Sequence, residues 1–457
     1  MFELERDVNK KVHFIGIGGI SMSALAEILL EYGYNVSGSD RASSHLTDKL
    51  STMGAKIFIG HAAENIGDAD IVVYTAAVKD DNPELIAARE KNLIIYDRAE
   101  FLGQIMKRYK KGIAIAGTHG KTTTTSLVSL MLLNANLDAT LMVGGEVDAI
   151  GGNVKVGKSD YFVTEACEYK ESFLKFYPYI GVILNVDADH LDYYRDINHI
   201  KDAFLKFGKL IPKEGLAVGC ADDSNVLEIF EKLDCNKLTY GIKKGDFRAE
   251  NISYDERGCA SFTATLNGSF YGEFKLSIPG EHNVLNSLAT IACGHFLGID
   301  LETIRKSLED FKGTHRRFEK KGEKNGVVVV DDYAHHPAEI IATLKAAKNY
   351  PHNKIYCVFQ PHTYTRTYSL FKEFSEAFYN VDELILADIY AAREKDTGLV
   401  SSKMLSDAIE KNGVKSTYIQ SFEEIVEYLK TVLNPGDLLI TMGAGDVYKV
   451  GEMFLRS

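Results

Sequence analysis

Short apolar runs and segments with helical spacing alternate along the first hundred residues. An apolar run at 12–16 is followed by apolar positions three and four residues apart within 22–29, and a second run begins at 34. Further apolar runs follow at 57–59, 71–75 and 93–95. This pattern predicts short β-strands that alternate with α-helices. Such an order is typical of a parallel, Rossmann-like sheet.

The rest of the chain repeats this alternation, with one interruption. Apolar runs recur at 113–116, 161–164 and 180–184, and again at 327–330, 355–359, 384–387 and 438–441. Between them, residues 215–275 contain short strand-like pieces separated by glycines, which predicts an antiparallel excursion. The last four runs each end in a polar, charged loop, and parallel strands would bring those loops to one edge of a sheet.

A glycine-rich turn, GTHGKTTTT, lies between the run at 113–116 and a helical segment. A turn between a strand and a helix directs backbone N–H groups at an anion, and the helix dipole reinforces them. Lys121 can reach the β- and γ-phosphates of ATP, and the Thr122 hydroxyl suits Mg²⁺. The loop is a shortened variant, since Ile115 stands five residues before Gly120. The candidate ATP-binding residues of this loop are Gly117, Thr118, His119, Gly120, Lys121, Thr122 and Thr123.

A second glycine turn, GIGGIS, follows the run at 12–16. The turn is typical of an NAD site, but its third glycine position holds Ser21, which weakens that interpretation. Another nucleoside diphosphate, such as a UDP-sugar, can use the same turn and helix dipole. Asp40 lies where a ribose-binding acid is expected. The candidate residues of this nucleotide site are Gly16, Gly18, Gly19, Ser21, Ser39, Asp40, His61 and Thr75.

Acidic residues follow two apolar runs of the central region. EACE ends one run with Glu165, and NVDADHLD ends the next with two acids before His190. Carboxylates beside a phosphate loop are natural Mg²⁺ ligands, and the Asp/His group can hold metal or neutralise phosphate. Asn283 and Asn286 share one helix face, where their amides either contact a nucleotide or cap the helix.

Composition narrows the class of protein. The 457 residues correspond to about three domains, and the net charge of -12 argues against a general nucleic-acid or membrane-surface binder. The six cysteines form no C-x-x-C pair, and no signal-like or membrane-spanning apolar stretch occurs. These features predict a cytoplasmic protein with reduced thiols and no membrane partner.

Three candidate sites in one chain suit a reaction in which ATP activates one substrate and a second substrate attacks it. The motifs GIGGISMS, GTHGKTTT, EACE, NVDADHLD, HNVLN, GTHRRFE, DDYAHHPAE, FQPHTYTRT and GAGD resemble those of the Mur ligase family, in the family's order. The resemblance extends over nearly the whole chain. It implies three α/β domains: a Rossmann-like domain at 1–108, a central P-loop ATPase-like domain at 109–315 and a Rossmann-like C-terminal domain at 316–457.

The resemblance also implies substrates and roles. The first domain would bind UDP-N-acetylmuramate, the second ATP with Mg²⁺ (two ions during turnover) and the third L-alanine. Lys121 would stabilise the transferred phosphoryl group. Thr122 and Glu165 would hold one Mg²⁺, and His190 the second. ATP would also be held by Asn283, Asn286, Arg317 and Asp332, and the amino acid by Tyr333, His335, His362 and Arg366.

Two positions depart from the family pattern: Cys167 stands where many relatives have aspartate, and Thr363 where many have arginine. Three other functions stay open at this point. They are a sister ligase that adds a murein tripeptide, a non-catalytic nucleotide-sensing module and an NAD-dependent oxidoreductase. The sequence is compatible with a monomer or a homodimer.

Overall fold

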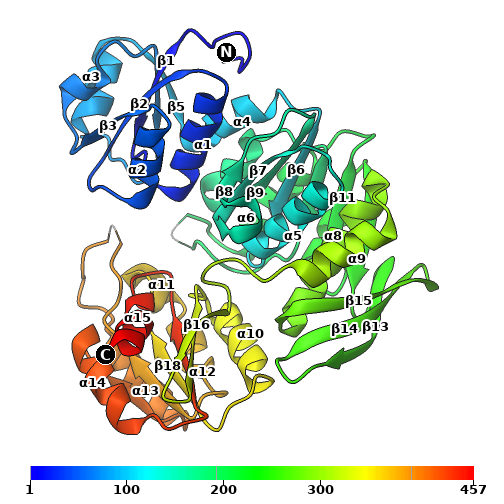
Figure 1. The fold of residues 1–457 in the computed structure, drawn as a ribbon, viewed down its shortest axis with the longest axis vertical. Coiled ribbons are helices and arrows are strands. Elements are labelled where there is room, and N and C mark those ends of the chain that lie inside the picture. Colours follow the sequence, from blue (N-terminus) through cyan, green and yellow to red (C-terminus); the bar gives the residue numbers. More distant parts are fainter. Residues whose placement is uncertain (1, 192, 393) are drawn as a thin grey trace. The chain divides into compact units, whose positions relative to one another are not determined.

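The computed structural model describes residues 2–191, 193–392 and 394–457; Met1, Asp192 and Arg393 lie outside the described residues. The chain divides into two compact units. The first unit contains residues 2–187, 198–240 and 289–304, and the second contains the other described residues. Each unit carries sheet and helix, as the α/β prediction requires (Figure 1).

The first sheet is fully parallel, with the strand order β3-β2-β1-β4-β5. Its strands are β1 (Lys11–Ile15), β2 (Asn35–Asp40), β3 (Lys56–Ile59), β4 (Ile71–Tyr74) and β5 (Ile94–Asp97). The connecting helices are α1 (Ile20–Glu31), α2 (His45–Thr52), α3 (Pro83–Glu90) and α4 (Arg98–Met106), and a 3-10 turn η1 spans Ala63–Ile66. The order reverses between β1 and β4, and this reversal point is where such sheets bind ligands. The Rossmann-like prediction for this region is confirmed.

The first unit also contains a second set of strands in the order β12-β11-β10-β6-β9-β7-β8. They are β6 (Lys111–Ala116), β7 (Thr140–Val147), β8 (Gly152–Lys155), β9 (Tyr161–Ala166), β10 (Ile180–Ile183), β11 (Leu216–Cys220) and β12 (Asn236–Gly241). The helical segments are α5 (Lys121–Asn134), η2 (Asp148–Ile150), η3 (Tyr169–Lys175), α6 (Ile197–Gly208) and α7 (Ser224–Phe230). All neighbouring pairs run parallel except β7 with β8. The carboxyl ends of β10, β6 and β9 are therefore adjacent.

The predicted antiparallel excursion is present as β13 (Phe247–Tyr254), β14 (Cys259–Leu266) and β15 (Ser269–Pro279). Figure 1 shows these three strands side by side. The chain continues into α8 (Glu281–Leu297) and α9 (Leu301–Asp310).

The third sheet, in the second unit, has the order β16-β17-β21-β18-β19-β20 and is parallel except for its edge strand β16. Its strands are β16 (Glu319–Lys324), β17 (Val327–Asp332), β18 (Ile355–Phe359), β19 (Glu383–Leu386), β20 (Ser416–Tyr418) and β21 (Leu438–Met442). Its helices are α10 (Pro337–Lys348), α11 (Tyr364–Ser369), α12 (Phe371–Glu376), α13 (Ser402–Lys411), α14 (Phe422–Val432) and α15 (Tyr448–Arg456).

Alternate residues of the central strands of the third sheet pack into two different cores. Ile355 and Phe359 of β18 join the core formed with α10, α12 and α13, whereas Val358 joins the core formed with α14 and α15. This follows from the two-residue period of a strand covered on both faces. Both faces of the third sheet are therefore buried by packing. Its binding residues are expected in the loops at the carboxyl ends of the strands.

Within the described part of the chain, no helix is both long and apolar enough to span a bilayer. All six cysteines are free thiols, four of them buried. Burial raises the pKa of the Cys293 thiol to about 12 and that of Cys220 to about 11. These two thiols are therefore protonated at neutral pH.

We expect Gly103→Ala to destabilise the protein. Alanine normally stabilises a helix interior by about 0.5–1 kcal/mol relative to glycine. In α4, however, a Cβ at position 103 would lie 2.1 Å from the backbone oxygen of Lys175. Overpacking of this kind costs roughly 1–3 kcal/mol, which corresponds to a fall of about 2–6 °C in the thermal midpoint. The matched control is Ser51→Ala, at an exposed position of helix α2. An unchanged or higher midpoint for Gly103→Ala would contradict the packing described here.

Candidate active site

The turn between β6 and α5 has the conformation expected of a phosphate-binding loop. Gly117 and Gly120 have φ angles of 145° and 84°, which favour glycine. A side chain at Gly117 would also lie 2.9 Å from the Cβ of Leu184, which directly follows β10. Both the backbone conformation and the close packing against Leu184 therefore disfavour a side chain at Gly117.

Asn185 fixes the shape of this turn, a role that the sequence interpretation missed. Its Oδ1 accepts a hydrogen bond from the His119 backbone N–H at 2.7 Å, and its Nδ2 donates to the His119 carbonyl at 3.0 Å. The Thr118 hydroxyl accepts from the Asp187 N–H at 2.9 Å. The sequence offered one signal for this role, since Asn185 carries an amide and directly follows the apolar run at 180–184.

Lys121 is bound within the loop and to a buried acid. Its Nζ donates to the carbonyl oxygens of Gly117 and, at 3.0 Å, Thr118. It also pairs with the Glu168 carboxylate at 3.0 Å. Burial opposes the charged form, but the Glu168 carboxylate outweighs it and raises the pKa of Lys121. A phosphate at this loop therefore meets a protonated lysine and competes with Glu168 for it.

Glu165 and Thr122, the predicted Mg²⁺ ligands, lie in the same unit as the loop. Glu165 pairs with Ile115 across β9 and β6, and its Oε1 accepts from the Gly144 N–H at 2.8 Å. Thr122 is buried in the first turn of α5. In the described ranges, no three His, Cys, Asp or Glu side chains are already grouped for a metal. A hydroxyl and a carboxylate still fit Mg²⁺, which usually takes one or two protein oxygens together with phosphates and water.

The glycine turn after β1 is tied to the end of β2. Gly16 and Ile17 both donate backbone N–H groups to the Ser39 carbonyl, at 2.8 and 3.0 Å. Gly18 donates its N–H to Asp40 Oδ2 at 2.9 Å. Gly16 also lies against Thr75, because a Cβ there would be 2.7 Å from the Thr75 methyl group. Asp40 therefore holds the turn itself, and its role toward a ribose stays a prediction.

Glu84, which the sequence interpretation did not select, binds residues of β1, β2 and the 3-10 turn η1 in the first sheet region. Its fully buried carboxylate accepts from the Ser39 hydroxyl at 2.6 Å and from Asn65 Nδ2 at 2.6 Å. It also lies 3.2 Å from His13 Nε2. The Ser39 hydroxyl in turn lies 3.0 Å from Nδ1 of the predicted residue His61. We refer to Glu84, Ser39, Asn65, His13 and His61 as the Glu84 cluster.

The Glu84 cluster strongly favours an ionised carboxylate. Burial acts to raise the pKa of Glu84, but hydrogen bonds from His13, Ser39 and Asn65 outweigh it and lower the pKa to about 2. In the sequence, Glu84 is an acid at the start of a helix after Asn82 and Pro83, and nothing there predicts its burial. Only the fold brings these donors around it.

In the second unit, Asn283 and Asn286 hydrogen-bond to each other and to the chain. Asn286 Nδ2 donates to Asn283 Oδ1 at 3.0 Å, and Asn283 Nδ2 donates to the Pro279 carbonyl at 2.7 Å. Both side chains are buried at the start of α8. Both residues lie inside α8, which begins at Glu281, so neither is its N-cap, and contact with ATP stays a prediction.

The two adjacent arginines before β16 have different environments. Arg316 pairs with Asp331 at 2.9 Å and donates to the Gly443 carbonyl at 2.8 Å. The Arg317 guanidinium lies 5.2 Å from the centre of the Tyr333 ring. Arg316 thereby ties β17 to β21, and Arg317 is the arginine that stays predicted for phosphate.

Asp332, predicted for the nucleotide site, is buried at the end of β17. It accepts backbone N–H groups of Ala334 at 2.7 Å and Phe318 at 2.8 Å. Burial raises its pKa to about 6, against the opposing effect of Arg317 and these hydrogen bonds. The carboxyl is therefore poised to change charge near neutral pH when its surroundings change.

The four residues predicted for the amino-acid site lie together. Arg366 Nη1 is 3.1 Å from His362 Nδ1, and the His362 ring is 5.8 Å from that of His335. The Tyr333 ring is 5.6 Å from the His335 ring. Burial lowers the pKa of His335 to about 4, so this histidine is neutral at pH 7. Tyr390, not predicted, stacks on His362 at 5.6 Å.

Two further features adjoin Arg366. The carboxylate of Asp189 lies 3.4 Å from Arg366 Nε, and the Asp189 Oδ1 accepts from the backbone N–H of His190 at 2.7 Å. Thr363, which departs from the family pattern, precedes α11 with φ 65° and ψ 146°. Its carbonyl accepts from the Thr367 hydroxyl at 2.7 Å. An unusual backbone conformation thus lies three residues before the arginine.

Three consecutive parts of the chain match models of a single protein family. Residues 11–110 match the Mur ligase family catalytic domain, 115–294 the Mur ligase middle domain and 316–445 the Mur ligase glutamate ligase domain. The chain is 62% identical to a UDP-N-acetylmuramate–L-alanine ligase of Clostridium tetani over 98% of both chains. The chain belongs to the Mur ligase family.

Solved structures of Mur ligases agree with this assignment. A UDP-N-acetylmuramate-alanine ligase from Thermotoga maritima is 33% identical, covers 98% of this chain and 99% of its own, and has a TM-score of 0.85. A murein peptide ligase from Psychrobacter arcticus is 24% identical, covers 98% of both chains and has a TM-score of 0.74, which shows a shared fold. The predicted family is therefore confirmed.

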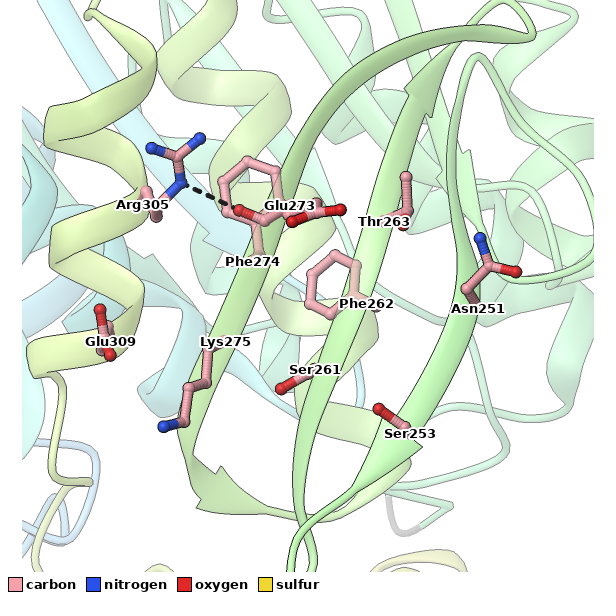
Figure 2. A pocket seen from close by; sticks show the side chains of 10 residues that line it. All are labelled: Asn251, Ser253, Ser261, Phe262, Thr263, Glu273, Phe274, Lys275, Arg305 and Glu309. Carbon is pink, nitrogen blue, oxygen red and sulfur yellow. Dashed lines mark hydrogen bonds between the residues drawn. The ribbon is translucent and has the colours of Figure 1, made fainter.

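One cavity of this Mur ligase involves none of the predicted site residues. It has a volume of about 540 Å³ and lies on strands β13–β15 beside α9 (Figure 2). Arg305 closes one side by donating to the Glu273 carbonyl at 3.0 Å. Its other lining residues are Asn251, Ser253, Ser261, Phe262, Thr263, Phe274, Lys275 and Glu309.

We expect Glu84→Gln to destabilise this Mur ligase by about 2–3 kcal/mol at pH 7, because the new amide N–H₂ would face donors that now point at a carboxylate. A carboxyl with a folded-state pKa of about 2 instead of 4.5 stabilises the fold fully above pH 4.5 and progressively less as pH falls toward 2. The loss of stability in the variant, measured by urea unfolding, should therefore be smaller at pH 4 than at pH 7.

Glu90→Gln, at an exposed position of the same helix, is the matched control and should leave stability nearly unchanged at both pH values. A loss for Glu84→Gln that is equal at pH 7 and pH 4 would show that the charge of Glu84 does not stabilise the fold.

Proposed function

We propose that this Mur ligase joins L-alanine to the lactyl carboxylate of UDP-N-acetylmuramate in peptidoglycan precursor synthesis, with ATP converted to ADP and phosphate. The observation that carries the proposal is the full-length similarity to curated ligases of that name. The grouping of Tyr333, His335, His362 and Arg366 in one unit supports it, because a small zwitterion needs a compact polar site.

ATP would place its phosphates in the turn Gly117–Gly120. The backbone N–H groups at the start of α5 favour an anion there, as the helix dipole does. Lys121 would exchange Glu168 for the γ-phosphate and stabilise the charge of the transferring group. Asn283, Asn286, Arg317 and Asp332 stay proposed contacts of the nucleotide.

Thr122 and Glu165 would hold one Mg²⁺ and His190 the second. When bound, Mg²⁺ neutralises phosphate charge and so favours attack by an anionic carboxylate. The protein's contribution is to present oxygen donors beside Lys121 and to keep them oriented. The hydrogen bond from Gly144 to Glu165 serves that purpose.

The reaction would take place in two steps. An oxygen of the lactyl carboxylate attacks the γ-phosphorus of ATP, the bond to the β-phosphate oxygen breaks, and an acyl phosphate and ADP form. The neutral amine of alanine then attacks the acyl carbon, the tetrahedral intermediate expels inorganic phosphate, and the amine loses a proton as the amide forms. Both steps depend on positioning and charge stabilisation, which this chain's residues would supply.

The proposal also assigns domains. Residues 1–108 would bind the UDP-sugar through the glycine turn, Ser21, Ser39, Asp40, His61 and Thr75. Residues 109–315 would bind ATP, and 316–457 would bind alanine. A cytoplasmic location and a monomeric or homodimeric state belong to the same proposal.

The decisive experiment measures phosphate release from the purified protein with ATP, Mg²⁺ and UDP-N-acetylmuramate, with and without L-alanine. The proposal requires release that depends on all substrates and a mass gain of one alanine residue on the sugar nucleotide. Release with a murein tripeptide instead of alanine would assign the sister-ligase activity. ATP binding without turnover, whichever amine is offered, would contradict ligation.

We expect Lys121→Ala to reduce turnover by several orders of magnitude, because no other side chain would supply the ammonium to the γ-phosphate. Binding of UDP-N-acetylmuramate, measured by calorimetry, should persist, since the sugar-nucleotide site uses the first glycine turn. Lys110→Ala removes an exposed lysine just before β6 and is the matched control. Loss of sugar-nucleotide binding in Lys121→Ala would show that the two sites are not independent.

We expect Arg366→Ala to raise the KM for L-alanine by about 10- to 150-fold, because a charged hydrogen-bonded pair contributes roughly 1.5–3 kcal/mol. The KM for ATP should change much less. Arg456→Ala, at an exposed position near the chain end, serves as the control. Equal increases in both KM values would remove Arg366 from the amino-acid site.

A further inference from the structure

A carboxylate of the protein already lies against the guanidinium proposed for the substrate carboxylate. Asp189 Oδ1 is 3.4 Å from Arg366 Nε and 3.5 Å from Nη2, and the two side chains are 10% and 13% exposed. These distances exceed the 2.7–2.9 Å of a close charged hydrogen bond. The pair is therefore nearly buried and loosely bonded.

The surroundings of Asp189 are mostly neutral or cationic. Its Oδ1 contacts Arg366 and accepts the backbone N–H of His190 at 2.7 Å, and its Oδ2 lies 3.7 Å from His190 Nε2. The nearby acid Glu339 is engaged by the backbone N–H groups of residues 335 and 336, at 3.0 and 3.3 Å. Asp189 is thus the carboxylate that contacts Arg366, and Oδ2 is its more weakly held oxygen.

An α-amino acid carries a carboxylate and an ammonium group separated by a single carbon atom. A site for it needs a cation and an anion side by side, and each must give up only weak contacts to accept the ligand. Burying either charge of the ligand without a partner would cost several kcal/mol. The Arg366–Asp189 pair meets these requirements.

We propose that Asp189 binds the ammonium group of the incoming amino acid while Arg366 binds its carboxylate. The inference rests on the proposed function and deepens it by naming the residue that selects for a free α-amino group. The zwitterion replaces one ion pair by two, and binding involves no covalent change. Asp189 anchors the amine before proton loss and does not accept the proton.

The test compares L-alanine with propionate, which has the carboxylate and lacks the ammonium. In Asp189→Asn the KM for alanine should rise at least tenfold, because its ammonium loses a charged partner. Inhibition by propionate against alanine should become stronger, because the neutral amide of the variant neither repels a carboxylate nor competes for Arg366. A residue with only a structural role would weaken both ligands, so opposite signs identify the anchor.

Asp196→Asn is the matched control, since Asp196 lies in the same segment and is exposed. It should leave both values unchanged. Weaker binding of both ligands to Asp189→Asn, or an unchanged KM for alanine, would overturn the inference. Failure of the wild-type protein to use alanine at all would instead overturn the proposed function, so the two failures are distinguishable.

Discussion

The ammonium group of Lys121 needs a negative partner in a loop that largely excludes water, and this requirement organises the first unit. Glu168 follows β9, Asn185 follows β10 and Gly117 follows β6. Because β10, β6 and β9 are neighbours and run parallel, these three loops meet at one edge of the sheet. The parallel order of β10, β6 and β9 therefore brings together the counter-ion Glu168, the clamping residue Asn185 and the glycine turn.

The same rule explains the first sheet, with a different partner for the turn. There the glycine turn is held by Ser39 and Asp40 at the end of β2. Ser39 takes part through both its carbonyl and its hydroxyl, so it links the turn to the ionised Glu84. A change in the charge of the Glu84 cluster would thus be felt at the turn through one residue.

Much of the fold could be predicted from the sequence because its signals are local. The glycine turns, the apolar runs of parallel strands and the glycine-punctuated segment around β13–β15 each reflect the conformation of a few consecutive residues. Arg366 and Asp189 are 177 residues apart, and Glu84 lies 71 residues from His13. No local period reports such pairs, since tertiary packing decides which polar groups a buried acid meets. The role of Asn185 was missed for a related reason, because Asn185 follows β10 but its hydrogen bonds hold the loop after β6.

The backbone at Thr363 places two demands on one position. Its φ and ψ of 65° and 146° lie close to a region that glycine adopts freely and a β-branched residue adopts at a cost of about 1–3 kcal/mol. The threonine hydroxyl and carbonyl hold the first turn of α11, which carries Arg366. Glycine at this position would relieve the backbone cost but would lose the hydroxyl that caps α11. A search for thermostable variants of this protein would therefore meet two opposing effects on stability at position 363.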